Sequence, residues 1–378
     1  MQPRVLFTAS SCSHISNFHR PYLRAFHQRG WEVHVACGGP ELPLPEADRI
    51  FLLPFEKKIS SPANFRAQAQ LRRLMAEQRY ALVTTHTSLA AFFTRRAAAG
   101  LGSARPPLVN VAHGYLFDDA TAPLKRTVLL SAERIAARQT DLLLTMNAYD
   151  LQLAQAHRLG RRVEAIPGIG VDFSRLDHPP GPPSALRATY GFSPEDLVLL
   201  YGAEFSPRKN QAMLLRALPL LPRHVKLLLP GQGALLEDCR AAAASMGLAD
   251  RVVFPGQIRD MAPLYALADA AVTASRSEGL PFNVMEAMYA GLPVIASRVK
   301  GHTDLLTEGL TGLLYPWDDA EAFAGAVRRL LEDSAGAAAM GRAAHAAVLP
   351  FSLERVLPQV MERYLSLLPQ AAAPAFST

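Results

Sequence analysis

The feature that most constrains the fold of this chain is a regular alternation of short β-rich apolar runs with helical stretches. In the first half, apolar runs at residues 5–9, 81–85, 108–112 and 142–145 alternate with amphipathic stretches such as 63–78. Strands that alternate with helices of about 10–15 residues form βαβ units with parallel strands. The sequence therefore predicts an α/β fold with doubly wound parallel sheets.

A proline-rich run divides the chain into two parts. The length of 378 residues exceeds the size at which one core usually keeps growing, so we expect two domains. Proline and glycine interrupt the alternation over 174–196, which is typical of a linker. We predict a Rossmann-like domain at 1–172, a boundary at 173–196, a second Rossmann-like domain at 197–350, a helix at 351–368 that returns to the first domain, and a disordered tail at 369–378.

Charge, apolar runs and cysteine content indicate which partners and which cellular compartment to expect. A net charge of +6 suits anionic small molecules or an anionic membrane surface as well as nucleic acid, and the charge runs are short, as on a solvated face. From the chain as a whole we expect no nucleic-acid partner. The sequence has no run of about 18 apolar residues, so we expect no membrane-spanning helix. The N-terminus lacks a signal-peptide layout. Cys12, Cys37 and Cys239 are odd in number and lack CxxC spacing, so we expect reduced thiols. These features predict a cytoplasmic protein, peripheral at the membrane face if its substrate is a lipid.

The stretch 277–288 reads Ser-Glu-Gly-Leu-Pro-Phe-Asn-Val-Met-Glu-Ala-Met and joins an apolar strand to a helix through a tight turn. The first N–H groups of a helix have no internal partner and lie at the positive end of its dipole, so they bind anions. Glu278 in the loop and Glu286 about one turn into the helix can hold hydroxyl groups. A sugar attached to a diphosphate offers that combination, whereas the alternative is two surface glutamates at a helix start.

Other loops that follow strands supply further candidates. Arg208 and Lys209 lie in the loop 202–210 and can neutralise a diphosphate, or they are two solvated cations. The pattern Gly231-Gln232-Gly233 is weak evidence and equally fits a tight turn. The loop 256–259 can receive a nucleobase on its backbone, with Arg259 stacked on the ring.

Three histidines follow strands of the first half. His113, beside a glycine, can bind a transferred sugar or share a proton, and His14 and His86 can contact an acceptor. For each of them the alternative is a structural histidine. The sequence lacks the GxSxG elbow that would indicate a hydrolase. It also has no His/Cys/Asp cluster with metal-ligand spacing, so we expect no metal site.

With these motifs in place, the chain resembles the retaining glycosyltransferases of family 4, which have the GT-B fold with two Rossmann-like domains facing a cleft. The Glu-x7-Glu stretch from Glu278 to Glu286 is the most specific match. Further matches at 13–15, 18–19, 21–23, 112–114, 166–172 and 208–211 are most similar to capsular and exopolysaccharide enzymes. The chain departs from the family in three places. Many members have Gly-Arg where this chain has Ala203-Glu204, and the first loop of this chain is rich in serine instead of glycine. At 300–304 this chain has Lys-Gly-His-Thr-Asp, where Gly-Gly and a glutamate are frequent in the family.

The resemblance implies roles for individual residues. His113, Glu278 and Lys209 would be catalytic, and Glu286 would hold the ribose. His14 and His86 are acceptor-side candidates from their own positions after strands. The donor-binding set would be Arg208, Lys209, Arg259, Glu278, Gly279, Leu280, Pro281, Phe282, Asn283, Val284 and Glu286. No cofactor other than the donor, and no metal, is implied.

The predicted activity is retaining transfer of a hexosyl or N-acetylhexosaminyl group from a nucleotide diphosphate sugar, with UDP as the expected nucleotide. The acceptor would be a glycan, free or linked to polyprenyl diphosphate, in the biosynthesis of a surface polysaccharide. Because no residue is an obvious covalent nucleophile, a front-face mechanism fits better than double displacement. The alternatives are a nucleotide-sugar 2-epimerase and a non-catalytic nucleotide-sugar-binding subunit.

Overall fold

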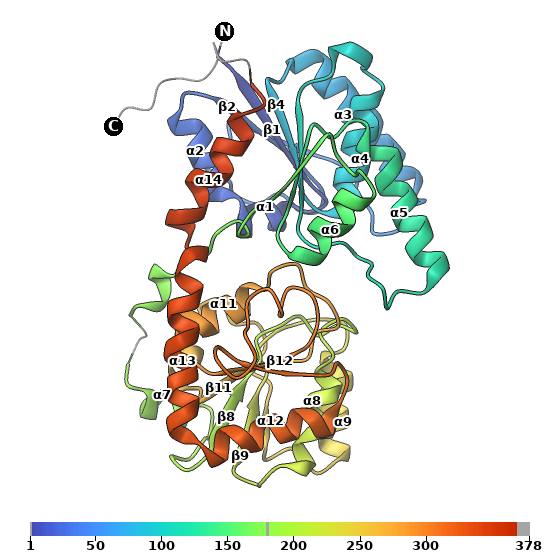
Figure 1. Ribbon diagram of the computed structural model, residues 1–378. Helices are drawn as coiled ribbons and strands as arrows, with labels where there is room; N and C mark the ends of the chain where they lie inside the picture. The colour runs from blue at the N-terminus through green and yellow to red at the C-terminus, as the bar shows by residue number, and fades with distance from the viewer. Residues whose placement is uncertain (1, 179–180, 369–378) are drawn as a thin grey trace. The chain divides into compact units, whose positions relative to one another are not determined.

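The computed structural model describes residues 2–178 and 181–368, and it divides into two compact units. The first unit comprises Met1–Gly170 and Glu354–Thr378, and the second comprises Val171–Leu353. The tail expected to be disordered, 369–378, lies outside the described residues. Each unit contains one parallel sheet with helices on both faces (Figure 1).

The first unit is built on a seven-stranded sheet in the order β3-β2-β1-β4-β5-β6-β7. All of its strand pairs are parallel. The strands are β1 (Arg4–Ala9), β2 (Glu32–Cys37), β3 (Arg49–Leu52), β4 (Leu82–Thr85), β5 (Leu108–Ala112), β6 (Leu142–Thr145) and β7 (Arg162–Ala165). The order reverses between β1 and β4, which makes the sheet doubly wound.

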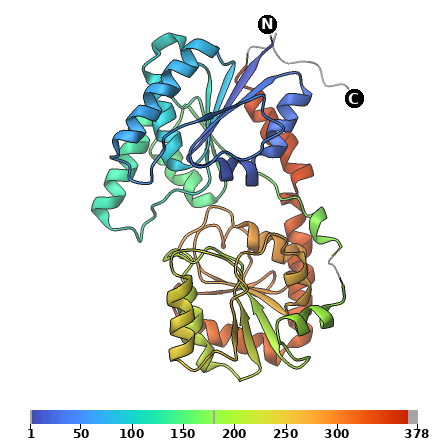
Figure 2. The ribbon, with the colours of Figure 1, turned by 180° about the vertical axis from the view of Figure 1, so that it is seen from behind.

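Helices of the first unit cover both faces of this sheet. They are α1 (Cys12–Phe18), α2 (Arg20–Gln28), α3 (Pro62–Gln78), α4 (Ser88–Ala99), α5 (Pro123–Ala137), α6 (Ala148–Ala156) and α14 (Leu353–Leu365), with a short η1 (Gly102–Ala104). Figures 1 and 2 show α2 and α14 on one face and α3, α4 and α5 on the other. The rings of Tyr22 and Phe26 on α2 contact Tyr364 on α14, each at a centroid distance of 6.1 Å.

The second unit has a six-stranded parallel sheet in the order β10-β9-β8-β11-β12-β13. The strands are β8 (Leu197–Leu200), β9 (Val225–Leu228), β10 (Val252–Val253), β11 (Ala270–Thr273), β12 (Val294–Ser297) and β13 (Leu313–Tyr315). Here the order reverses between β8 and β11. The short strands are almost entirely buried, as expected for a sheet covered on both faces.

The helices of the second unit are α7 (Pro183–Thr189), α8 (Gln211–Ala217), α9 (Leu236–Ser245), α10 (Ala262–Leu267), α11 (Phe282–Tyr289), α12 (Ala320–Glu332) and α13 (Ser334–Val348), with short η2 (Ser174–Leu176), η3 (Leu218–Leu220) and η4 (Leu349–Phe351). In both ribbon views α8 and α9 cover one face, and α11 and α13 cover the other (Figures 1 and 2). The predicted class, α/β with two doubly wound parallel sheets, is confirmed.

The expected linker at 173–196 is partly wrong, because it contains α7. A proline at the first helical position costs no hydrogen bond, and Pro183 occupies that position. The guanidinium of Arg187 lies 2.6 Å from Oδ1 of Asp269, and α7 packs against α10. The segment is therefore attached to the second unit. Pro179 and Pro180 lie outside the described residues.

The segment after β1 and its loop forms two helices, α1 and α2, which are separated at His19. His19 has φ −120° and ψ −3°, and Pro21 follows in the first turn of α2. Ser11 caps α1 by accepting from the backbone N–H of His14 at 3.3 Å. His14, which the sequence placed in a loop, therefore lies in α1.

The expectation of reduced thiols is wrong for Cys12 and Cys37, which form a disulfide bond. Strands β1 and β2 are parallel neighbours, and the N–H of Cys12 donates to the carbonyl of Gly38 at 2.9 Å. These contacts place the two Cα atoms 5.1 Å apart, within the range that a disulfide spans. A separation of 25 residues gave no sign of this proximity, and Cys239 remains a buried free thiol.

Candidate functional site

The loops after β8 and β11 lie where the strand order of the second sheet reverses. In open α/β sheets, ligands bind outside the carboxyl ends of the strands at such a point. The loop after β8 carries Arg208 and Lys209, and the loop after β11 carries Glu278. Topology thus brings together two segments that are about 70 residues apart in the sequence.

Glu278 is the centre of this site. Its Oε1 accepts from Nζ of Lys209 at 2.5 Å, and its Oε2 accepts from Nη1 of Arg208 at 2.8 Å. Burial raises the pKa of Glu278, but the charges of Lys209 and Arg208 outweigh burial and lower it to about 2. The carboxylate is therefore ionised at neutral pH, and two cations around one carboxylate leave an excess positive charge.

Backbone and hydroxyl contacts fix the two loops against each other. The hydroxyl of Tyr201 donates to the carbonyl of Lys209 at 3.1 Å and lies 2.9 Å from Oγ of Ser275. The N–H of Arg276 donates to the carbonyl of Arg208 at 2.8 Å. Asn210, which begins α8, has φ 52°, a left-handed conformation that asparagine adopts more readily than most residues. The cations are thus held by a defined backbone.

A third loop, which follows β12, lies against Glu278. Gly301 has φ +83°, and a Cβ there would lie 2.9 Å from Cβ of Glu278 and from the carbonyl of Gly279. Next to it, His302 is fully buried and lies 2.8 Å from the carbonyl of Ser297. Burial lowers the pKa of His302 to about 4 despite the nearby Glu278. In the sequence, this segment is visible only as a departure from the family pattern.

Glu286, on α11, is buried but has polar partners. Its Oε1 accepts from Arg175, and its Oε2 accepts from the hydroxyl of Tyr265 at 2.9 Å. The same hydroxyl lies 3.2 Å from the carbonyl of Asn283, whose own side-chain amide donates to the carbonyl of Gly202 at 3.2 Å. Sequence reasoning missed Arg175 and Tyr265, because neither belongs to a motif.

The remaining donor-side candidates surround this pair of glutamates. The buried end of the loop consists of Gly279, Leu280 and Pro281. The first turn of α11 consists of Phe282, Asn283 and Val284, and its backbone N–H groups have no i−4 partner within the helix. Arg259 is exposed in the loop between β10 and α10. The structure thus brings every donor-side candidate onto loops or helix starts of one unit.

The glycines of Gly231-Gln232-Gly233 are required by packing. A Cβ at Gly231 would lie 2.0 Å from the carbonyl oxygen of Ala203, and one at Gly233 would lie 2.3 Å from that of Phe205. The N–H groups of Gly231, Ala203 and Phe205 donate to backbone carbonyls. This geometry favours the interpretation as a tight turn, in which these three amides already have partners.

The acceptor-side candidates lie together in the first unit, around the reversal between β1 and β4. His14 is on α1 after β1, His86 follows β4, and His113 follows β5. Nδ1 of His86 lies 3.2 Å from Nε2 of His113, and the rings of His14 and His113 meet edge to face at 4.8 Å. The structure adds His19, whose ring centroid lies 3.8 Å from that of His86. The pattern Phe18-His19 was noted in the sequence without a role.

All four histidines are held in the neutral form. Burial lowers the pKa of His14 to about 4 and those of His19, His86 and His113 well below the usual value, with repulsion among the rings as a further cause for these three. Each ring therefore has one nitrogen lone pair free of a proton at neutral pH.

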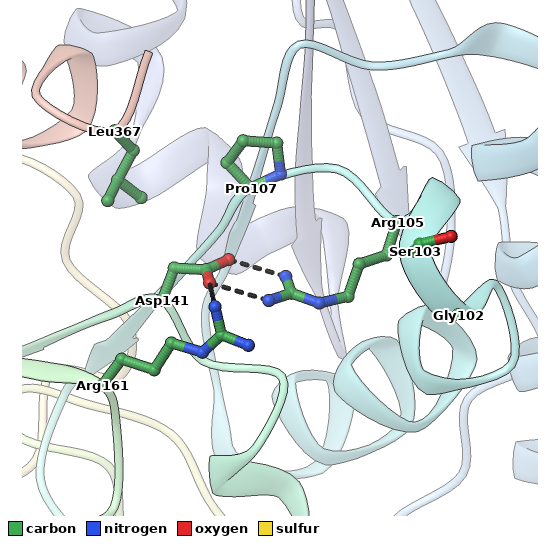
Figure 3. Close-up of a pocket in the computed structure, with 7 residues that line it drawn as sticks. All are labelled: Gly102, Ser103, Arg105, Pro107, Asp141, Arg161 and Leu367. Carbon is green, nitrogen blue, oxygen red and sulfur yellow. Dashed lines mark hydrogen bonds and ion pairs between the residues drawn. The ribbon is translucent and has the colours of Figure 1, made fainter. Parts of the chain in front are cut away.

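A separate pocket of about 450 Å³ lies at the opposite edge of the first sheet (Figure 3). Its residues precede strands or follow α14, and Figure 3 shows Asp141 facing both Arg105 and Arg161. Asp141 accepts from both terminal nitrogens of Arg105, at 2.6 and 2.7 Å, and from the N–H of Leu108 at 2.9 Å. Because ligands of such sheets bind at the carboxyl edge, this ion-paired pocket is best explained as structural.

Two family models match the chain. One, described as glycosyltransferase family 4, matches residues 22–175, and the other, described as glycosyl transferases group 1, matches residues 196–333. The first match lies mainly in the first unit, and the second lies within the second unit.

Curated relatives extend over most of the chain. A Bacillus subtilis protein, EpsD, named as a glycosyltransferase, is 33% identical over 371 residues, which cover 96% of this chain and 97% of EpsD. An Escherichia coli protein, named UDP-Gal:α-D-GlcNAc-diphosphoundecaprenol α-1,3-galactosyltransferase, is 24% identical over 80% of this chain and 81% of its own.

Solved structures share the fold. HepE from Anabaena, in complex with UDP and glucose, matches with a TM-score of 0.80 at 21% identity, covering 96% of this chain and 99% of its own. No helix within residues 2–178 and 181–368 has the length and apolar content of a membrane span.

Proposed function

Because the chain belongs to glycosyltransferase family 4 and has the GT-B fold, we propose that it transfers a sugar from a UDP-sugar, with retention of configuration, to a glycan acceptor linked to polyprenyl diphosphate. The coarser activity, glycosyl transfer from a nucleotide sugar, follows from membership of the family. The nucleotide, the sugar and the acceptor are the proposal. We place the reaction in the biosynthesis of a surface polysaccharide.

The observation that carries the proposal is the contact of Glu278 with Lys209 and Arg208. A diphosphate leaving group carries negative charge, which develops further as the bond to the sugar breaks. Preorganised charges and dipoles aimed at such developing charge usually make the largest single contribution to catalysis. Held by Glu278 and by backbone contacts, Lys209 and Arg208 need no reorganisation when that charge appears.

Glu278 and Glu286 take different roles in this proposal. Glu278 contacts hydroxyls of the donor sugar through its remaining lone pairs while it orients the two cations. Glu286 accepts from the ribose hydroxyls, and the backbone N–H groups at the start of α11 face sugar and phosphate. Arg259 stacks on the base. No side chain in this set is suited to be a covalent nucleophile, since Glu278 is tied to two cations, so front-face transfer is favoured.

The histidines of the first unit serve the acceptor and the transferred sugar. His113 is the proposed contact of the reacting sugar, and His14 and His86 are acceptor-side groups. Because burial keeps these rings neutral, each can accept a proton through a lone pair or donate through its remaining N–H. Replacement of His113 is expected to lower kcat while the affinity for UDP stays unchanged.

A lipid-linked acceptor requires access to a membrane surface, and α5 offers the chemistry for it. Leu124, Val128 and Ile135 are exposed on this helix at 80%, 59% and 53% of their surface. Lys125 and Arg134 are exposed on the same helix. A helix that combines exposed apolar and basic side chains can bind an anionic membrane surface through apolar burial and charge attraction. The E. coli relative, whose name includes a diphosphoundecaprenol acceptor, supports this class of acceptor.

The test is incubation of the purified protein with a panel of labelled UDP- and GDP-sugars, with and without a lipid extract. Label that moves to the organic phase only when lipid is present supports transfer, and the anomeric configuration of the product tests retention. Release of a free epimer without acceptor would instead identify a 2-epimerase. Tight donor binding without turnover under any condition would identify a binding subunit.

A further inference from the structure

Three histidines of the first unit form a cluster of metal-ligand type. His14, His19 and His113 each offer a ring nitrogen, and these nitrogens lie within 4.8 Å of one another. Two of them come from the α1–α2 segment, and the third comes from the loop after β5, about 100 residues later. That separation explains why no motif with metal-ligand spacing is visible in the sequence.

We propose that His14, His19 and His113 bind one divalent transition-metal ion, with zinc as the ion that best suits the ligand set. Neutral imidazole is a preferred ligand of Zn²⁺, and three protein ligands leave the fourth position of a tetrahedral ion open to water or another small ligand. The site shares His14 and His113 with the proposed function, so with an ion bound these residues would reach the acceptor and the transferred sugar through the open position of the ion and not through their own lone pairs.

The distance between two of the nitrogens fits such an ion. Zinc–nitrogen bonds of about 2.0–2.1 Å at tetrahedral angles place neighbouring ligand nitrogens roughly 3.3–3.4 Å apart. Nε2 of His14 lies 3.3 Å from Nε2 of His19. Without an ion, one proton must lie between these two nitrogens. A metal ion in that place uses the lone pairs of both rings.

A second layer of hydrogen bonds orients the third ligand. Nδ1 of His86 lies 3.2 Å from Nε2 of His113, and Nε2 of His86 lies 3.1 Å from Oγ1 of the buried Thr84. Histidine ligands of metals nearly always use the other ring nitrogen in a hydrogen bond that fixes the ring. The chain Thr84–His86–His113 provides that support, so we assign His86 a positioning role.

The polar atoms of the cluster are not all satisfied by the protein. His19 is fully buried, and its Nδ1, the ring nitrogen that does not face His14, has no hydrogen-bond partner in the part of the chain that the structure describes. The scaffold around it is firm, since Cys12, two residues before His14, is bonded to Cys37 of β2. Two of the nitrogens already lie at the spacing that one ion requires, and a side-chain rotation of the third ring within the 4.8 Å spread completes the site.

The test uses the full-length protein with Zn²⁺ in calorimetry and with Co²⁺ as a visible probe of tetrahedral coordination. We expect one equivalent of either ion to bind. His14→Gln and His113→Gln are each expected to weaken binding by at least about 100-fold, because each removes a direct ligand. The matched control is His27→Gln, an exposed histidine on α2, which should bind metal as the unchanged protein does.

Two results would overturn the site. One is a folded, unchanged protein that binds neither ion at micromolar concentration, and the other is binding that persists in both ligand variants. If the variants fail to fold, zinc-edge X-ray absorption of the unchanged protein decides. Imidazole scattering from three nitrogens at about 2.0 Å supports the proposal, whereas a shell of oxygen or sulfur contradicts it.

Discussion

Nζ of Lys209 lies 2.5 Å from Oε1 of Glu278, and both side chains are buried. The sequence assigned the lysine to the diphosphate and the glutamate to the sugar, as separate contacts. Their contact makes them one unit, in which the carboxylate fixes the position of the cation. A change in either residue therefore affects both the stability of the protein and donor binding.

Glu278→Gln should destabilise the protein by roughly 3–5 kcal/mol, because it leaves Lys209 buried without its ion-pair partner. Urea unfolding followed by circular dichroism measures the loss. Lys209→Met should cost less, since Glu278 keeps Arg208. The control is Arg216→Ala, which removes an exposed ion pair with Asp318 and should cost less than about 1 kcal/mol. Equal costs for Glu278→Gln and Arg216→Ala would contradict the importance of burial.

The stability contributed by Glu278 should depend on pH in a defined window. Its pKa is about 2 in the folded protein against 4.5 in the unfolded chain, so the unfolded chain binds the proton first as the pH falls. The contribution is complete above pH 4.5 and is lost as the pH falls toward 2, with a size of about 3 kcal/mol. The difference in unfolding free energy between the unchanged protein and Glu278→Gln should therefore shrink from about pH 6 to about pH 3. A constant difference over that range would disprove the shift.

Glu286→Ala should weaken the binding of UDP by roughly tenfold to a hundredfold, because the ribose loses a charged hydrogen-bond acceptor. Calorimetry with UDP measures the change, and the melting temperature confirms that the variant folds. Glu237→Ala, an exposed glutamate in the first turn of α9, is the matched control and should leave the affinity unchanged. Unaltered affinity in Glu286→Ala would remove the ribose role.

Gly301→Ala should destabilise the protein by about 1–3 kcal/mol and reduce transfer, because its Cβ would collide with Glu278 and the backbone would be strained at φ +83°. Thermal unfolding and steady-state rates measure the two effects. Gly325→Ala, inside α12 with no atom within 4 Å of the new Cβ, is the control and should stabilise slightly. A variant Gly301→Ala with full stability and full activity would show that the loop after β12 has room to move.

The double variant Leu124→Ser/Val128→Ser should reduce binding to vesicles that contain anionic lipid by at least about tenfold, because two exposed apolar side chains no longer enter the membrane surface. Co-sedimentation measures the bound fraction. Leu310→Ser, a leucine of the second unit that is as exposed as Val128, should bind as the unchanged protein does. Identical binding by the double variant and this control would exclude α5 as the attachment surface.

The fold could be predicted because it depends on local patterns. Buried parallel strands are short apolar runs, and their alternation with helices of sufficient length determines the class without knowledge of any contact. The boundaries that were wrong depend on finer effects. Pro183 begins a helix inside the expected linker, and His19 separates α1 from α2.

The candidate site could be predicted only as a list of loops. Motifs located Glu278, Glu286 and Lys209, because each follows a strand in a recognisable pattern. Their partners could not be predicted, since Arg175 and Tyr265 reach Glu286 from segments 111 and 21 residues away in the chain. The same holds for the bond between Cys12 and Cys37, which depends on which strands are neighbours.

The first and last residues of the second unit lie next to each other and are joined by backbone hydrogen bonds. The N–H of Val171 donates to the carbonyl of Phe351 at 3.0 Å, and the N–H of Leu353 donates to the carbonyl of Val171 at 2.8 Å. A continuous segment with adjoining ends can be removed or replaced as one cassette, as in domain insertion. A gene encoding this chain can therefore exchange its Lys209–Glu278 half by recombination at two points while the histidine-bearing half is inherited intact.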